Sequence, residues 1–159
     1  MFKQDTRTRA LGLGVAITGS MVVASTAFAG ECPADKMKPN VRAIVDYKPV
    51  GVTDVTLGSI DLGKQPAHIE GRELRFRKLT IEPGGIVPWH SHDDRPALIF
   101  VEQGEIIEYA SSCEVAITHK AGDIRPEVFG TSHWWKNLGK EMVILYVSDV
   151  RKDPNDHNM

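Results

Sequence analysis

Short apolar runs, separated by turn residues, follow one another through most of the chain. The runs are rich in β-branched and aromatic residues and end at Gly, Pro, Asp or Asn, which is typical of β-strands joined by tight turns. No segment carries the 3.6-residue apolar stripe of a helix over a helical length. The pattern predicts strands at residues 55–62, 73–82, 85–92, 97–102, 105–109, 114–119, 123–128, 132–136 and 141–150.

The alternation is clearest at residues 73–82. Arg75 and Arg77 fall on one face of this strand and Leu74 and Phe76 on the other, because successive side chains of a strand point to opposite sides. Many short strands with turns between them favour an all-β sandwich or barrel.

A length of 159 residues suits one domain with a substantial core. We expect the barrel to occupy residues 54–150. Residues 30–53 contain several prolines and little periodicity, which predicts an extended N-terminal arm. Residues 151–159 are polar and predict a flexible tail.

The N-terminus has the pattern of a secretory signal peptide. A positively charged start that includes Arg7 and Arg9 precedes a run of small and apolar residues at 10–24, and Ala27-Phe28-Ala29 supplies a small-x-small cleavage signal. The run is short for a membrane span, although an uncleaved anchor is the alternative. Residues 1–29 are therefore predicted to be removed, with the mature protein secreted to the bacterial periplasm and free of the membrane.

Cys32 and Cys113 are the two cysteines of the sequence. In an oxidising compartment such a pair predicts one disulfide, which would close a loop of about 80 residues and stabilise the fold by ~4 kcal/mol. The alternative is that Cys113 is a free buried thiol.

Charge excludes one class of partner. Lys and Arg total 19 against 21 for Asp and Glu, so the chain lacks the basic footprint of a nucleic-acid binder.

Two histidines on one predicted strand suggest a metal site. His90 and His92 lie two residues apart, so they should point to the same side, and Pro88 should share their face. Neutral imidazole is a good ligand for divalent transition metals. The pair alone is also compatible with two solvated or core histidines. A third histidine, His133, lies on another predicted strand.

The two segments together resemble the paired motifs of the cupin superfamily. The first motif, G-x5-H-x-H-x3/4-E-x6-G, matches at Gly84, His90, His92 and Gly104, with Ala97 at the glutamate position. The second motif, G-x5-P-x-G-x2-H-x3-N, matches at Gly122, Gly130, His133 and Asn137, with Val128 at the proline position.

This resemblance implies a jelly-roll barrel, or double-stranded β-helix, with a metal site inside it. His90, His92 and His133 would then bind one divalent ion, which the sequence leaves open among Fe, Mn, Ni, Cu and Zn. Ala97 in place of the family's glutamate implies neutral ligands only and one more open coordination position. Three-histidine cupins include oxygenases, so the resemblance suggests a dioxygenase.

Several residues near the histidines are candidates for a substrate pocket, although each is also explained as barrel core. They are Trp89, Ala97, Ile99, Val101, Trp134 and Tyr146.

Other polar residues have less defined roles. We expect solvent or Arg95, rather than metal, as the partner of Asp93 and Asp94. His68 and His119 are expected at the surface. A general base, if one is needed, has its candidates in Tyr109, Tyr146, His68 and Glu127.

The sequence therefore supports more than one function. The first is a metal-dependent oxidoreductase of the dioxygenase type that acts on a small chelating organic substrate. The alternative is a non-catalytic cupin that binds a metal or small ligand as a carrier, sensor or accessory protein. An isomerase or lyase that uses the metal only as a Lewis acid is a third. A homodimer is also expected.

Overall fold

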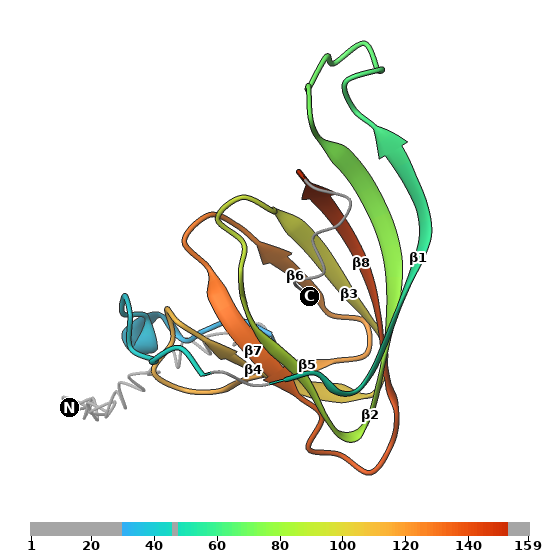
Figure 1. Cartoon of the computed structure of the whole chain (residues 1–159). Coiled ribbons are helices and arrows are strands. Elements are labelled where there is room, and N and C mark those ends of the chain that lie inside the picture. Colours follow the sequence, from blue (N-terminus) through green and yellow to red (C-terminus); the bar gives the residue numbers. More distant parts are fainter. Residues whose placement is uncertain (1–29, 46–47, 153–159) are drawn as a thin grey trace, which may run out of the picture.

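The computed structural model describes residues 30–45 and 48–152 as an antiparallel sheet that curls around an interior (Figure 1). The all-β architecture expected from the sequence is confirmed. A short 3-10 helix precedes the strands. The elements are η1 (Ala34–Lys36), β1 (Val50–Asp61), β2 (Glu73–Ser91), β3 (Ala97–Gln103), β4 (Glu105–Ala110), β5 (Ile117–Lys120), β6 (Ile124–Glu127), β7 (Ser132–Lys136) and β8 (Val143–Arg151).

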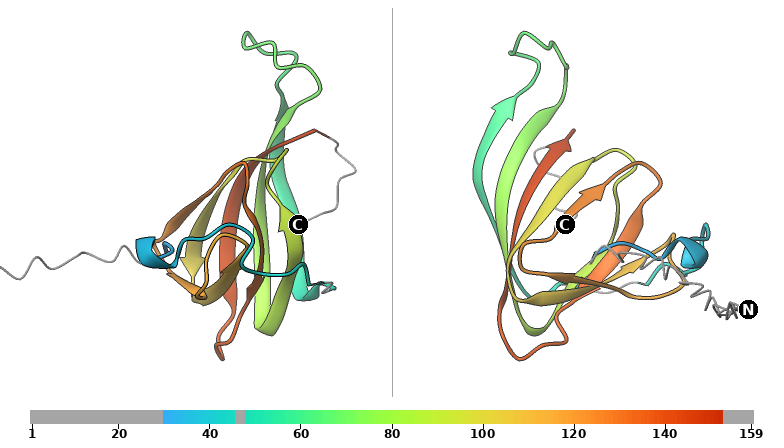
Figure 2. Two further views of the ribbon diagram at one scale, coloured as in Figure 1. Left: turned by 90° about the vertical axis from the view of Figure 1, so that its left-hand side faces the viewer. Right: turned by 180° about the vertical axis from the view of Figure 1, so that it is seen from behind.

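The strand order is β5-β4-β7-β2-β8-β3-β6, with β1 paired to β2. β1 begins at Val50, so the first strand starts inside the segment expected to be the arm. β1 and the first half of β2 form a long hairpin that extends beyond the rest of the barrel (Figure 2). The predicted leader, residues 1–29, and residues 153–159 of the predicted tail lie outside the described residues.

β2 joins the two sides of the barrel. Two strands and a turn were expected here, but residues 73–91 form one bent strand. Its residues 73–81 pair with β8, whereas residues 86–91 pair with β7. At the bend, a Cβ atom on Gly85 would lie 2.7 Å from a side-chain carbon of Ile81 and 2.8 Å from the carbonyl oxygen of Glu82. Glycine is therefore the residue that allows this close approach.

The interior combines an apolar core with buried charges. The core cluster comprises Leu79, Ile81, Val87, Ala97, Ile99, Val101, Ile106, Trp135, Val143, Leu145 and Val147. On β2 the arginine face is the buried one, with Arg75 and Arg77 at 5% and 3% exposure, whereas Phe76 is 45% exposed. The faces of this strand are thus the reverse of what hydrophobicity alone favours.

Asp149 on β8 holds these arginines. Arg75 donates from Nε and Nη2 to the two carboxylate oxygens of Asp149, over 2.9 and 2.6 Å. Nε of Arg77 and Nε of Arg95 lie 3.7 and 3.9 Å from the same carboxylate, and Arg77 also pairs with Asp54. Burial alone would raise the pKa of Asp149, but the hydrogen bonds from Arg75 and the nearby arginine charges hold that pKa below its ordinary value.

The Cys32–Cys113 disulfide is present, as expected, and fixes the arm to the barrel. Met37 forms a β-bridge with Cys113, and Cys32 packs against a small cluster that contains Ala110 and Ile117. A covalent bond between these residues is typical of an oxidising compartment. No helix among the described residues has the length and apolar character needed to cross a membrane.

The outer face of the sheet exposes a group of apolar side chains. Phe76 stacks on Tyr146 at a centroid distance of 5.6 Å, and the same face carries Leu98, Phe100 and Ile124. The homodimer expected from the sequence stays a prediction.

We expect Asp149→Asn to lower the free energy of unfolding by about 3–5 kcal/mol, because it removes the carboxylate that compensates buried arginine charges. Urea denaturation followed by tryptophan fluorescence measures the change. The control is Asp61→Asn, which breaks the exposed pair with Lys64 and should leave the unfolding midpoint unchanged. An unchanged midpoint for Asp149→Asn would show that this pairing does not stabilise the fold.

The same pair predicts acid sensitivity. Because the pKa of Asp149 is lowered in the folded state, its contribution is complete above the unfolded pKa of about 3.9 and is lost as pH falls through the folded pKa. Wild type should therefore lose more stability than Asp149→Asn when pH falls below ~4. If the free energy of unfolding falls equally with pH in the two proteins, the lowered pKa of Asp149 does not contribute to acid sensitivity.

Candidate metal centre

Three histidines converge inside the barrel from two neighbouring strands. His90 on β2 is the cross-strand partner of His133 on β7, and His92 follows directly after β2. A β-bulge lies between Val87 and His90, where β2 takes one more residue than β7. As a result, Val87 rather than Pro88 lines the interior with the histidines.

The Nε2 atoms of the three rings form an equilateral triangle. Each Nε2 of His90, His92 and His133 lies 3.1 Å from the other two. The exposed fractions of the residues are 9%, 2% and 0%. The three rings thus present one nitrogen each to a single buried point.

The opposite ring nitrogens set the protonation state. Nδ1 of His90 donates to the carbonyl of Pro88 over 2.9 Å, and Nδ1 of His92 donates to the carbonyl of Arg95 over 2.8 Å. Nδ1 of His133 donates to a carboxylate oxygen of Glu108 over 2.8 Å. With each proton on Nδ1, every Nε2 keeps a lone pair for a ligand.

This donor set fits a divalent metal ion. Imidazole nitrogens bind such ions at about 2.0–2.1 Å, and three atoms can share one ion at that bond length when they lie within roughly 3.6 Å of one another. The observed 3.1 Å satisfies this condition. Three lone pairs that face each other without a proton between them also require a cation. His90, His92 and His133 are therefore the residues that would hold it.

Burial and neighbouring charges keep His90 and His92 neutral. Burial, followed by the charges of His133 and His92, lowers the pKa of His90 well below its ordinary value. Burial and the charge of His133 lower the pKa of His92 to about 4. Neutral rings are the form that binds metal.

Glu108 on β4 connects His133 to a fourth histidine. One carboxylate oxygen accepts the bond from His133, and the other accepts a 2.8 Å bond from Nε2 of His119. Burial alone would raise the pKa of Glu108, but these two bonds outweigh it and hold the pKa below its ordinary range. The expectation that His119 lies at the surface is wrong, since it is fully buried and stacks on Trp135.

Glu127 on β6 is a second buried carboxylate beside His133. Its Oε1 accepts from Nε of Arg125 over 3.2 Å and lies 3.5 Å from Nδ1 of His133. Its Oε2 is buried and has no hydrogen-bond partner within the described residues. Burial raises the pKa of Glu127 to about 7, with the charge of Glu108 acting in the same direction.

The surroundings of Ala97 explain the absence of a glutamate there. Ala97 on β3 pairs with Asp149 on one side and with Glu127 on the other. All three are buried, and directly opposed side chains in an antiparallel sheet lie about 4.5–5.5 Å apart. A glutamate at position 97 would place three carboxylates side by side in the interior, which is unfavourable.

A cavity of about 20 Å³ adjoins the histidines. Arg77 reaches it from β2, and Ile99 is the member of the sequence-predicted pocket that lines it. The other lining residues are Leu79, Val87, His90, His92, Trp135, Leu145 and Val147. Ala97 and Val101 are buried on the same strand as Ile99 without lining this cavity.

The three aromatic residues expected in the pocket lie elsewhere. Trp134 stacks on Tyr109 at 4.1 Å, on the face of β7 opposite to His133. Tyr146 stacks on Phe76 at the outer face. Trp89 lies in the bulge and is half-buried. None of them lines the cavity, because strand alternation or the bulge turns them away from the lining side chains.

The remaining polar candidates have other partners. Asp94 pairs with Arg72, and Asp93 accepts a 2.8 Å bond from the backbone nitrogen of Gly130. His68 lies in the connection between β1 and β2, outside the barrel interior. Of the candidate bases, Glu127 is the one with a fully buried side chain beside the histidines.

Sequence reasoning missed Glu108 and the inward position of Arg77. Arg77 shares the inward face of β2 with Leu79 and Ile81, but also with Arg75. Glu108 shares the inward face of β4 with the apolar residues Ile106 and Ala110. Such a carboxylate is a signal for a buried polar network, because an isolated buried charge is costly.

Residues 77–148 match the cupin domain family. This region is a cupin domain. Solved structures show the same fold, at identities that support fold likeness only. One is oxalate oxidase in complex with the substrate analogue glycolate, with a TM-score of 0.51 and 21% identity over 74% of this chain and 60% of that chain. Another is TT1209 from Thermus thermophilus, with a TM-score of 0.51 and 15% identity over 70% of this chain and 92% of that chain.

The chain also resembles plant proteins in sequence. Auxin-binding protein ABP19b of Prunus persica is 27% identical over 128 residues, covering 74% of this chain and 61% of the relative. Germin-like protein 8-14 of Oryza sativa subsp. japonica is 30% identical over 90 residues, covering 54% of this chain and 42% of the relative. The chain thus spans less than two thirds of the length of these relatives.

We expect His92→Ala to abolish stoichiometric metal binding, because it removes one of three converging nitrogens. Metal content after equilibration with Zn²⁺ or Co²⁺ measures the effect by elemental analysis. His68→Ala is the matched control and should bind like wild type. Equal metal content in wild type and His92→Ala would refute the three-histidine site.

Glu108→Gln should weaken metal affinity by about 10–100-fold without abolishing binding, as is usual when a group that orients a ligand is lost. Competition titration with a chromophoric chelator measures the affinity. Glu105→Gln, at an exposed position on the same strand, is the control. An unchanged affinity for Glu108→Gln would show that the bond to His133 does not support the site.

Proposed function

We propose that this cupin is a metal-dependent oxidoreductase of the dioxygenase type that acts on a small, chelating organic anion. The proposal rests on one observation. Three imidazole nitrogens with free lone pairs surround one buried point, next to a cavity that Arg77 also lines. Neutral ligands and a guanidinium together favour a negatively charged molecule.

The chain's own residues would divide the work as follows. His90, His92 and His133 would hold the ion through Nε2. The bound ion would supply Lewis acidity and, if it is redox-active, electron transfer to dioxygen. Arg77 pairs with the carboxylate or enolate of the substrate. Leu79, Val87, Ile99 and Trp135 exclude water from the reacting atoms.

Glu127 is the proposed proton acceptor. It is the cross-strand partner of Ala97, so both side chains lie on the interior face of the sheet. Its Oε2 has no hydrogen bond within the described residues, which leaves this atom available to take a proton from a substrate hydroxyl group. The small side chain of Ala97 leaves the adjoining position to the substrate.

A relative of the same fold supports the choice of ligand class. Oxalate oxidase binds the substrate analogue glycolate, which is a small hydroxy acid. A molecule of this kind offers a carboxylate for Arg77 and a second oxygen for chelation. Hydroxy acids, keto acids and diketones are therefore the first compounds to test.

The second candidate is a non-catalytic binding protein. A cavity of about 20 Å³ accommodates little more than one water molecule, which favours a site that holds an ion rather than one that turns over a substrate. The similarity to auxin-binding proteins is compatible with a ligand-binding role.

We further propose that the protein works in the bacterial periplasm. The disulfide, the signal-like leader sequence and the resemblance to auxin-binding and germin-like proteins support export. The metal is accordingly acquired outside the cytoplasm, where Cu and Zn compete strongly for histidine ligands.

The deciding experiment loads the protein anaerobically with Fe²⁺ and measures oxygen uptake with a panel of hydroxy acids, keto acids, diketones, thiols and phenols. Uptake that depends on both metal and substrate supports the oxidoreductase. Tight metal binding without uptake for any compound supports the binding protein instead.

Two substitutions assign the roles within an active preparation. Glu127→Gln should retain metal and lower kcat by about 10²–10⁴-fold, as expected for the loss of a proton acceptor. Arg77→Lys keeps the charge but loses the planar fork, so it should raise KM for anionic substrates. Arg72→Lys, at the exposed pair with Asp94, is the control. Unchanged kcat in Glu127→Gln with full metal content would remove Glu127 from the mechanism.

A further inference from the structure

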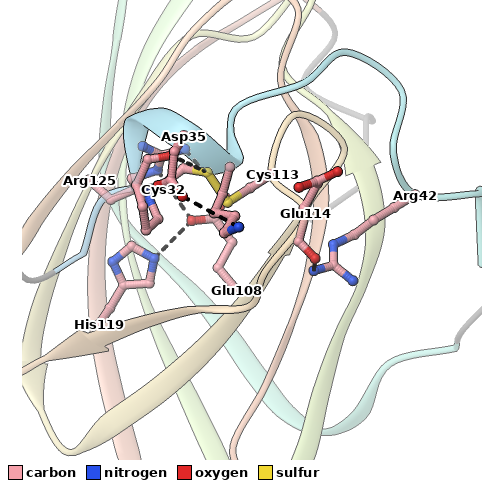
Figure 3. The surroundings of a disulfide bond; sticks show 10 residues. Cys32, Asp35, Arg42, Glu108, Cys113, Glu114, His119 and Arg125 are labelled. Carbon is pink, nitrogen blue, oxygen red and sulfur yellow. Dashed lines mark hydrogen bonds and ion pairs between the residues drawn. A yellow bond between two sulfur atoms is a disulfide. The ribbon is translucent and has the colours of Figure 1, made fainter.

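Gly30, at the start of the described chain, lies buried against the barrel. It directly follows Ala27-Phe28-Ala29, the sequence that predicts cleavage by a signal peptidase. Two residues later the Cys32–Cys113 disulfide joins the arm to the barrel, in the region that Figure 3 shows with Glu108 and His119. The fold therefore sets the position of residue 30.

The neighbours of Gly30 are two polar side chains. A Cβ atom on Gly30 would lie 2.9 Å from Nδ1 of His119 and 3.4 Å from Oδ2 of Asp123. A larger residue would press against the His119 ring, and the φ of +89° at residue 30 also favours glycine. Because a main-chain nitrogen lies about 2.5 Å from its own Cβ position, the nitrogen of Gly30 lies within roughly 5–6 Å of both groups.

Nδ1 of His119 requires a donor. His119 is fully buried, and its Nε2 donates to Glu108, which places the ring proton on Nε2. Nδ1 is then an acceptor, and it has no hydrogen bond within the described residues. A buried acceptor without a donor is unfavourable, so a group that completes this bond would stabilise the network.

We propose that cleavage after Ala29 makes Gly30 the N-terminus, and that its α-ammonium group donates to Nδ1 of His119 and pairs with Asp123. Water adds to the carbonyl carbon of Ala29 in the signal peptidase, and the bond to the nitrogen of Gly30 breaks. Ala29 leaves with the carboxylate. The freed amine takes up a proton at neutral pH, since α-amino groups have a pKa of about 7.7–8.0.

An ammonium group suits this position better than a peptide N–H. The peptide nitrogen supplies one donor, whereas the ammonium supplies three together with a positive charge. One N–H can serve His119, and a second can serve the carboxylate of Asp123. Asp123 Oδ2 already accepts a 2.8 Å bond from the backbone nitrogen of Lys120, which holds it in place.

The new terminus is thereby connected to the metal centre. Gly30 orients His119, His119 donates to Glu108, and Glu108 fixes the proton of His133 on Nδ1. Only the last residue of this series, His133, belongs to the proposed metal site, so the contacts of Gly30 with His119 and Asp123 do not depend on the proposed function. Removal of the leader is thus a processing event that completes the support of a metal ligand.

The first test identifies the N-terminus of the exported protein. Full-length precursor is expressed in a bacterial host, and the intact mass of the processed protein is measured. The expected mass is that of residues 30–159 with one disulfide. Any other N-terminus overturns the proposal.

The second test compares two oxidised preparations, one that begins at Gly30 and one that retains Phe28 and Ala29. In the protein that begins at Gly30, the α-amine should react with an acylating ester much more slowly when folded than when unfolded in urea. Its thermal midpoint should also be the higher of the two. Equal midpoints together with rapid acylation of the folded protein overturn the proposal, whether or not a metal binds.

The third test separates positioning from stability. The preparation that begins at Gly30 should bind Co²⁺ about tenfold more tightly than the extended one, at the low end of the range for groups that support a ligand. In a His119→Gln background this ratio should fall to one, because the connecting ring is gone. Asp123→Asn provides a second variant at a less buried position and should reduce the ratio. A ratio that is the same in all backgrounds overturns the connection to the metal site.

Discussion

Three imidazole lone pairs held 3.1 Å apart, with no proton between them, form the constraint on which the rest of this structure depends. Such an arrangement is stable only if each ring is fixed from behind. Two backbone carbonyls and the carboxylate of Glu108 do this. The bulge in β2 contains Pro88, which supplies one of these carbonyls, and the pairing of β4 with β7 brings Glu108 to His133.

Much of this centre could be predicted from the chain. The spacing of His90 and His92, with His133 among ordered glycines on a later strand, identified both the fold and the three converging residues. That was possible because a strand places every second residue on one face, and because the turns are marked by glycine. The cysteine pair was predictable for a different reason, since two cysteines in an oxidising compartment leave one pairing.

The polar interior was not predictable in the same way. Arg75 and Arg77 look like the solvent face of β2, and nothing local shows that Asp149, far along the chain, compensates them. Glu108 and His119 are likewise ordinary strand residues until the sheet closes and brings them together. Networks of this kind depend on cross-strand register, which a strand's own sequence does not contain.

The bend in β2 has a consequence for how this barrel can change during evolution. Arg77 and His90 belong to a single hydrogen-bonded strand, on opposite sides of the close approach at Gly85, and His92 follows directly after that strand. The span between guanidinium and imidazoles is thus set by the curvature of one strand, and not by the length of a loop. Insertions in the loops would leave that span unchanged, so a shift toward longer or shorter ligands would have to come from the bend itself.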